Sequence, residues 1–315
     1  KGFSFNNKPL QFRLFKDVED PNYNQVFLMP LLEFNNIYDG ITLGAKVYNG
    51  TLLRKSFNYK LQPKYSLNSR SFTGSGTVYY IHDIENSDLY QMSFGFGGSY
   101  SSYAPELFVR QLMPSITLNF REDSDFRSNM RQALKFRYVD IHRDEDTSNL
   151  LNITKPNYSV FNVNFINSND NLINFKRWVA DLQIGKTFSK ISFNYEYRKL
   201  FESNRQFNIR LFTGAFLKNN NEANSNYFSF ALDRPTDYLF DYNYLGRSES
   251  SGIFSQQYIE AEGGFKSKLD PAFANQWIST VNTSTTLWKY ILAYGDLGLV
   301  KNKYNSPKFV YDSGI

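Results

Sequence analysis

The combination of residues most suggestive of catalysis lies near His142. Asp140 precedes it by two positions, on the same face of an expected strand, and Asp144 follows it. A histidine beside carboxylates belongs to Ser–His–Asp hydrolases, so a hydrolytic site at the rim of a β-barrel is one interpretation. No serine lies in a recognisable nucleophile elbow, and a solvated histidine at a strand end explains the pattern more simply. His82 beside Asp83 is interpreted in the same way.

The composition excludes several other kinds of chemistry. The 315 residues include no cysteine and two histidines, which excludes cysteine-ligated and histidine-rich metal sites. There is no zinc-protease motif, no Walker loop and no dinucleotide fingerprint. The net charge of +5 comes from interspersed charges without a basic run, which argues against nucleic acid as a partner. We therefore predict no catalytic, cofactor-binding or metal-binding residue, and no enzymatic activity of this chain itself.

Alternation of apolar and polar residues is the strongest structural signal in the sequence. Within residues 189–199, Ile191 and Phe193 share one face, and Lys190 and Glu196 share the other. The same alternation recurs in three further segments, 111–121, 177–184 and 205–217. A period of two sorts residues onto the two faces of a β-strand, whereas a helix would scatter them around its axis.

The number and length of these segments favour a barrel. We count about 14–16 segments of roughly 9–12 residues, longer than the roughly 5–6 residues of ordinary strands. Turn residues separate them and no long helix intervenes, so the strands are expected to be antiparallel. A mean hydropathy of −0.48 with 18% aromatic residues suits neither helical membrane spans nor disorder. We predict an all-β fold, an antiparallel transmembrane β-barrel of about 14–16 strands, because closure removes open sheet edges.

The two faces of the strands are expected to meet different surroundings. A barrel of this size is too wide for an apolar core, so polar side chains should line the lumen and apolar ones should face lipid. A soluble all-β assembly with the faces reversed is the alternative. The residues predicted to face lipid are Ile116, Leu118, Leu182, Phe193, Tyr195, Ile209 and Leu211. The residues predicted to face the lumen are Lys135, Arg137, Asp181, Glu196, Arg198 and Arg210, whose mixed charges favour a filled lumen over a selective pore.

Residues 219–257 are long for a connection between strands, and they interleave aromatic and acidic residues. One interpretation is a contact surface for a partner domain, a glycan or a lipid headgroup. The interpretation that we favour is a loop or plug folded into the lumen, where tyrosine hydroxyls and Arg–Asp pairs satisfy one another. The residues assigned to this loop are Asp233, Arg234, Asp237, Tyr238, Phe240, Tyr242, Tyr244 and Arg247.

Several segments resemble a known family. They are KPLQF at 8–12, KDVEDP at 16–21, YDG at 38–40, ALDRPTDYLF at 231–240, GRSESSG at 246–252 and EGGFKSKL at 262–269. Together they resemble the C-terminal outer-membrane barrel of Bacteroidetes-type gluzincin zinc aminopeptidases. The resemblance implies a peptidase domain preceding the barrel in one polypeptide. No position here matches the zinc ligands or the catalytic glutamate of that family, so zinc is expected only if an upstream peptidase domain exists.

These observations define an expected domain organisation and function. We expect a linker leading into the barrel at 1–24 and the barrel itself at 25–315, with one or two closing strands missing from this sequence. The expected function is a membrane anchor or scaffold for an attached, peptidase-like domain. A diffusion or translocation pore, and a subunit of a larger outer-membrane assembly, are the alternatives. The expected location is the outer membrane of a Gram-negative bacterium, with membrane lipid and lipopolysaccharide as partners.

Overall fold

The computed structural model describes residues 8–15, 19–50, 52–121, 128–145, 157–221, 226–242 and 259–315. Its 17 elements of secondary structure are all strands. Among the described residues, no helix is long and apolar enough to cross a membrane. The strands are β1 (Leu10–Leu14), β2 (Asn24–Phe34), β3 (Ile41–Tyr48), β4 (Phe57–Ser66), β5 (Phe72–Asp83), β6 (Leu89–Ala104), β7 (Leu107–Phe120), β8 (Met130–Arg143), β9 (Tyr158–Asn169), β10 (Asn174–Gly185), β11 (Phe188–Leu200), β12 (Gln206–Asn219), β13 (Phe230–Ala231), β14 (Phe273–Ala274), β15 (Trp277–Trp288), β16 (Ile291–Lys301) and β17 (Lys308–Gly314).

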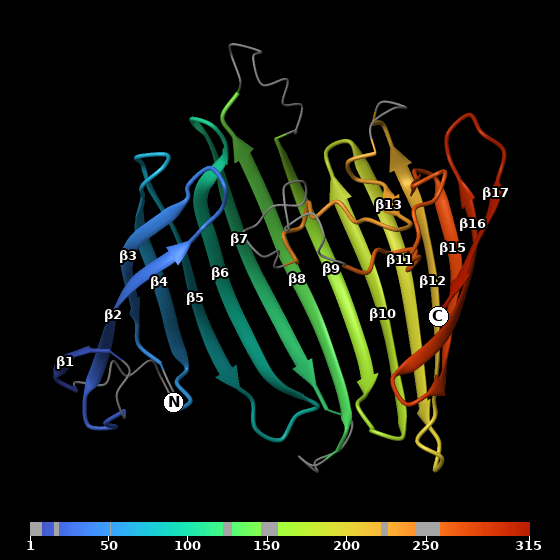
Figure 1. Cartoon of the computed structure of the whole chain (residues 1–315). Coiled ribbons are helices and arrows are strands. Elements are labelled where there is room, and N and C mark those ends of the chain that lie inside the picture. The colour runs from blue at the N-terminus through green and yellow to red at the C-terminus, as the bar shows by residue number, and fades with distance from the viewer. Residues whose placement is uncertain are drawn as a thin grey trace.

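One large sheet dominates the molecule. It contains 15 strands in the order β1 to β12, β15, β16 and β17, while β13 and β14 form a separate pair. The strands stand side by side as one wall, from β2 to β17 (Figure 1). From β2 to β17, each pair of neighbouring strands in this sheet is antiparallel. The predicted all-β, antiparallel fold of about 14–16 strands is confirmed. Within the described residues, no pairing joins β17 to β1 or β2.

The first strand lies in the region expected to be a linker. β1 pairs in parallel with β2, from Leu10 opposite Asn24 to Leu14 opposite Leu28. The alternation of apolar and polar residues in LQFRL gives this short segment the same pattern as the longer strands. The linker expected at 1–24 therefore contains an added strand at the edge of the sheet.

The antiparallel register places apolar residues beside apolar residues and polar residues beside polar residues. In the pairing of β10 with β11, Leu182 lies opposite Ile191 and Asp181 lies opposite Ser192. Because this pairing continues from strand to strand, one face of the sheet collects the apolar residues and the other collects the polar ones. We call the face that contains Asp181 the inner face and the opposite one the outer face.

Three prolines lie within strands, where proline cannot donate a ladder hydrogen bond. Pro63 of β4 pairs with Gly74 of β5, but the paired positions of β3 and β4 omit it. Pro114 of β7 pairs with Phe96 of β6 and is omitted between β7 and β8. Pro30 of β2 lies beyond the last position paired with β1. Each proline is thus accommodated by a gap in the pairing on one side, within a continuous strand.

Candidate functional site on the inner face

The connection between β12 and β15 returns across the inner face and covers part of it (Figure 1). We call its described residues 226–242 and 259–276 the inserted segment. One buried cluster combines residues of β7, β8, β9 and β11 with the inserted segment: Val109, Val139, Ile141, Val160, Phe188, Phe228, Tyr238 and Leu239. A second cluster is Phe212, Phe230, Leu232, Phe265, Ala274, Ile278, Val300 and Val310. The inner face is therefore apolar where the segment covers it, although the sequence predicts a polar lumen.

Lys190 of β11 is a charged residue buried in the contact between the wall and the inserted segment. It is 2% exposed, and its Nζ atom donates a hydrogen bond of 2.9 Å to the carbonyl oxygen of Phe228. The same nitrogen lies 4.3 Å from the ring centre of Phe230 and 5.1 Å from that of Tyr238. Aromatic faces stabilise a cation electrostatically, so the inserted segment replaces part of the hydration that Lys190 loses.

Two glycines in the wall give aromatic residues of the inserted segment room to approach. A Cβ atom on Gly214 of β12 would lie 2.6 Å from Phe230, and one on Gly298 of β16 would lie 3.0 Å from Phe265. Phe230 is 1% exposed and Phe265 is 0% exposed. A Cβ atom at Gly214 would overlap the ring, and one at Gly298 would make an unusually tight contact, so both rings depend on the absence of a side chain there.

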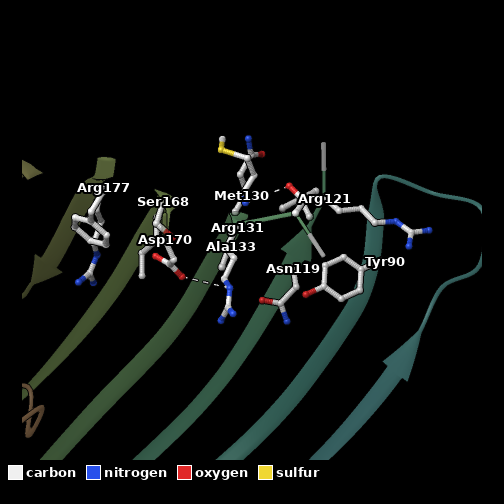
Figure 2. A pocket seen from close by; sticks show the side chains of 14 residues that line it. Tyr90, Asn119, Arg121, Met130, Arg131, Ala133, Ser168, Asp170 and Arg177 are labelled. Atoms are coloured by element: carbon white, nitrogen blue, oxygen red, sulfur yellow. Dashed lines mark hydrogen bonds and ion pairs between the residues drawn. The ribbon is translucent and has the colours of Figure 1, made fainter. Parts of the chain in front are cut away.

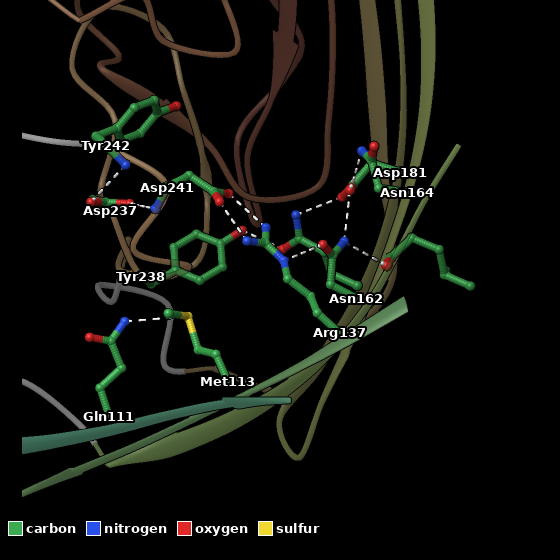
Figure 3. A network of polar contacts seen from close by, with 12 residues as sticks. Gln111, Met113, Arg137, Asn162, Asn164, Asp181, Asp237, Tyr238, Asp241 and Tyr242 are labelled. Atoms are coloured by element: carbon green, nitrogen blue, oxygen red, sulfur yellow. Dashed lines mark hydrogen bonds and ion pairs between the residues drawn. The ribbon is translucent and has the colours of Figure 1, made fainter. Parts of the chain in front are cut away.

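A charged pair joins the inserted segment to the middle of the wall. Arg137 of β8 donates from Nη1 and Nη2 to the two carboxylate oxygens of Asp241, at 2.5 and 2.6 Å (Figure 3). Its Nε atom donates to Oδ1 of Asn162 at 2.8 Å. The carboxylate of Asp237 in turn accepts the backbone N–H groups of Asp241 and Tyr242, at 2.7 and 3.2 Å. This forked geometry fixes the direction of both partners.

The pair continues into a network across β9 and β10 (Figure 3). Asp181 accepts hydrogen bonds from the amides of Asn162 at 2.7 Å, Asn164 at 3.0 Å and Gln183 at 2.7 Å. The hydroxyl of Tyr238 donates to Oε1 of Gln183. Tyr238 is 3% exposed, and this burial raises the pKa of its phenol well above the ordinary value of 10.0. The phenol therefore stays neutral while it is docked.

The second half of the inserted segment binds β12 and β15. Arg210 donates to the carbonyl oxygen of Glu262 at 2.9 Å and to the Asn282 side chain at 3.1 Å. Asn282 donates to the carbonyl oxygen of Gly263 at 3.1 Å. Glu260 lies 3.7 Å from Arg210. Arg210, predicted to be a lumen residue, thus holds the backbone of this segment rather than an acid of the wall.

An ion pair fixes the same half to β16. Lys266 of the segment lies 2.9 Å from Oδ2 of Asp296, whose side chain is 0% exposed. Its ammonium group also lies 4.3 Å from the ring centre of Tyr294. On β17, Asp312 accepts the backbone N–H and the hydroxyl of Ser267, each at 2.9 Å. In the sequence, Lys266 and Ser267 stand out only as part of the stretch 262–269 that carries the family resemblance.

The remaining residues assigned to the loop have varied positions. Asp233 is half-buried, and burial raises the pKa of its carboxyl group. Arg234 is exposed, and Phe240 packs against the first cluster. Tyr244 and Arg247 lie outside the described residues.

The other predicted lumen residues also lie on the inner face. Lys135 of β8 and Asp181 of β10 both lie opposite Asn164 of β9, one on each side of that strand. Glu196 lies opposite Arg210 in one pairing and opposite Arg177 in the other. Arg198 stacks over the ring of Phe175 at 5.0 Å. The wall places these charges near one another, and two ion pairs on this face, Arg137–Asp241 and Asp296–Lys266, reach the inserted segment.

The seven residues predicted to face lipid all lie on the outer face. One row of paired residues runs from Ile116 through Phe136 and Val163 to Leu182 and Ile191. A neighbouring row contains Leu118 and Phe193, and Tyr195 pairs with Leu211 next to Ile209. Ile116, Phe193 and Leu211 are 39%, 41% and 40% exposed. Whether lipid covers them remains a prediction.

The structure does not place His142 between a serine and a carboxylate, as a hydrolase site would require. The hydroxyl of Ser159 on β9 donates to Asp140 at 2.8 Å, so the carboxylate binds the hydroxyl directly. A catalytic triad requires the histidine between these two groups. His142 is exposed and pairs with Arg110. Within the described part of the chain, no group of three or more His, Asp or Glu residues could hold a metal ion.

A cavity of about 610 Å³ opens on the wall at the ends of β7 and β9 and the starts of β6, β8 and β10 (Figure 2). Its lining includes the guanidinium groups of Arg121, Arg131 and Arg177, and the carboxylate of Asp170. Tyr90 and Phe175 contribute aromatic rings. The cavity was not predictable from the sequence, because its basic residues come from three separate strand ends.

Comparisons with known proteins give limited similarity. No family model matches the chain, and no curated protein matches it. Among solved structures, the chain is similar to CdiB from Acinetobacter baumannii, with 11% sequence identity and a TM-score of 0.44. The similarity covers 94% of this chain and 55% of CdiB, so the chain spans about half of that protein's length. Similarity at this level does not define a shared family.

Proposed function

We propose that this chain is an integral outer-membrane β-barrel protein that serves as an anchor and scaffold, with its lumen filled by the inserted segment. The observation that carries the proposal is the contrast between the two faces of one sheet. The outer face exposes continuous rows of apolar residues, and the inner face holds charged residues and part of the chain itself.

The apolar rows are the reason for placing the outer face in lipid. Soluble monomers rarely expose contiguous apolar patches larger than a few hundred Å². Here large apolar side chains are exposed on strand after strand, including Leu43, Phe96, Phe193 and Leu299. In a bilayer these residues would be solvated by acyl chains, and the paired strands would satisfy their own backbone amides. Lipid and lipopolysaccharide are the partners expected at this surface.

The inserted segment is the reason for favouring a scaffold over an open channel. It covers the inner face with two buried clusters and several charge-assisted contacts, which favours a filled lumen. A rigid, filled barrel suits the attachment of another domain. We propose that this domain is peptidase-like, on the strength of the resemblance in segments 8–40 and 231–269. The zinc would then belong to that domain.

The test of the anchor proposal uses native outer membranes. We expect the protein to stay in the pellet after an alkaline carbonate wash, and its intact mass to exceed that of this chain by a zinc-containing domain. Release by carbonate would contradict membrane integration. Retention at a mass of 36.8 kDa without zinc would contradict the attached domain while leaving the barrel in place.

A translocation pore is the second candidate. It is favoured by the basic residues Arg131, Lys135 and Arg137 on the inner face of β8 and by the cavity at one end of the wall, neither of which a purely structural wall requires. In planar bilayers, the scaffold proposal predicts little conductance for the wild type. A stable conductance without any change to the inserted segment would instead support the pore. An assembly subunit remains the third proposal, tested by the size of the complex extracted in mild detergent.

A further inference from the structure

The described residues that line the cavity at the ends of β6 to β10 carry an excess of positive charge, with Arg121, Arg131 and Arg177 against Asp170. Arg131 lies 3.3 Å from Asp170, the carboxylate in the lining, and Arg121 lies 5.9 Å from the ring centre of Tyr90. Arg177 makes no ion pair with a described carboxylate. The nearest acid in the register is Glu196, directly opposite Arg177, which accepts a hydrogen bond of 2.6 Å from the amide of Asn194.

A column of basic residues leads from this cavity along β8. Arg131, Lys135 and Arg137 occupy alternate positions on the inner face, with Ala133 between the first two. Lys135, like Arg177, makes no ion pair with a described carboxylate. Residues on one face of a strand repeat every ~6.8 Å, so the column from Arg131 to Arg137 is about 20 Å long, and its part up to Lys135, beyond which Asp241 holds Arg137, is about 14 Å long. A single small anion cannot contact both ends of it.

Arg137, at the end of the column away from the cavity, already binds the side-chain carboxylate of a residue in this chain. Asp241 of the inserted segment receives both nitrogens of the Arg137 fork. An extended peptide has the same ~6.8 Å repeat between side chains on one face as β8 does, so acidic residues at alternate positions would match the column. Arginine forks recognise carboxylates by paired hydrogen bonds, and Tyr90 and Phe175 offer apolar contacts beside them.

We propose that the cavity and the basic column of β8 bind an extended, acidic segment of a partner polypeptide. The partner carries Asp or Glu at alternate positions and enters at the end of the wall where Arg121, Arg131 and Arg177 lie. Lys135 and Arg177 are the residues that select it, because no described acid of this chain pairs with them. Peptide binding involves only the inner face, so its test does not depend on whether lipid covers the outer face.

The test measures fluorescence anisotropy of a labelled peptide in which glutamate alternates with serine, added to the full chain in uncharged detergent at roughly 0.15 M salt. We expect Lys135→Gln and Arg177→Gln each to weaken binding about tenfold, equivalent to about 1.4 kcal/mol. Lys176→Gln is the matched control, because it removes the same charge from the adjacent, exposed position on the outer face. Arg177→Lys should restore part of the affinity.

Three outcomes would overturn the proposal. One is the absence of peptide binding to wild-type protein whose sheet content is intact by circular dichroism. Another is an equal loss in Lys176→Gln, which would indicate general electrostatic attraction. The third is inorganic pyrophosphate binding as tightly as the peptide, with both unaffected by Lys135→Gln, which would define a small-anion site at the cavity instead.

Discussion

At the scale of single residues, the inserted segment is held by charged side chains of the wall that are largely withdrawn from water. The side chain of Arg137 is 11% exposed, and its partner Asp241 is 47% exposed. Lys190 is nearly buried and relies on a carbonyl oxygen and aromatic rings. Such groups are costly to leave without partners, so they favour one position of the segment over others.

The Arg137–Asp241 pair should contribute measurably to stability. A double-mutant cycle with Arg137→Gln and Asp241→Asn is expected to give a coupling of about 1–3 kcal/mol in urea unfolding, because the bond is forked and half-buried. The exposed pair Arg131–Asp170 is the matched control, with side chains 77% and 41% exposed. Its coupling should stay below about 1 kcal/mol. Equal couplings for the two pairs would contradict the assigned role.

Burial of Tyr238 predicts a dependence on alkaline pH. Its pKa is raised in the folded protein, so its contribution to stability is present below pH 10.0 and is lost as pH rises above that value. The unfolding free energy of the wild type should therefore fall more steeply between about pH 9 and pH 11 than that of Tyr238→Phe. Tyr290→Phe, at a side chain 93% exposed, should follow the wild type. Parallel curves for wild type and Tyr238→Phe would refute the prediction.

Residue identities predicted which face each charge occupies, but not its partner. Lys135, Asp181 and Arg210 are assigned to one face by the period of two alone. The contact of Lys190 with Phe228 spans 38 positions of sequence, and no spacing rule relates such distant residues. The sequence predicts Arg–Asp pairs that satisfy one another in the loop at 219–257, and in the structure Asp241 of this loop pairs with Arg137 of β8.

At the scale of elements, the fit between wall and inserted segment depends on shape. Gly214→Ala should displace Phe230 and destabilise the protein by about 1–3 kcal/mol, because the added Cβ would overlap the ring. Gly295→Ala is the control, since its Cβ would meet Thr283 at an ordinary 3.7 Å. Urea unfolding together with limited proteolysis of the inserted segment measures both effects. Unchanged protection in Gly214→Ala would contradict the proposed fit.

The strands were predictable because apolar and polar residues alternate along their whole length. The two apolar clusters on the inner face were not predictable. Val139, Ile141 and Phe188 are apolar residues on a face that is otherwise polar. They are explained by their contact with the inserted segment. Residues 259–276 lack alternation and were not assigned to the loop. Their docking depends on backbone carbonyls and glycines, which carry no periodic signal.

At the scale of the whole molecule, one sheet separates two environments. The outer face offers apolar rows without a covering element among the described residues, and the inner face offers charges, a docked segment and a basic cavity. A soluble protein would have to cover the first of these faces. The proposed membrane barrel would account for both faces at once, and the proposed peptide partner concerns only the inner one.

The most direct test of the membrane placement compares adjacent residues. The chain contains no cysteine, so Phe193→Cys and Asn194→Cys can each carry one spin label on opposite faces of β11. In liposomes, we predict that the label at 193 is relaxed mainly by lipid-soluble oxygen and is shielded from a water-soluble nickel complex. The label at 194 should not show this preference for oxygen. Equal access of the nickel complex to both labels, or a preference for oxygen only at 194, would contradict the account.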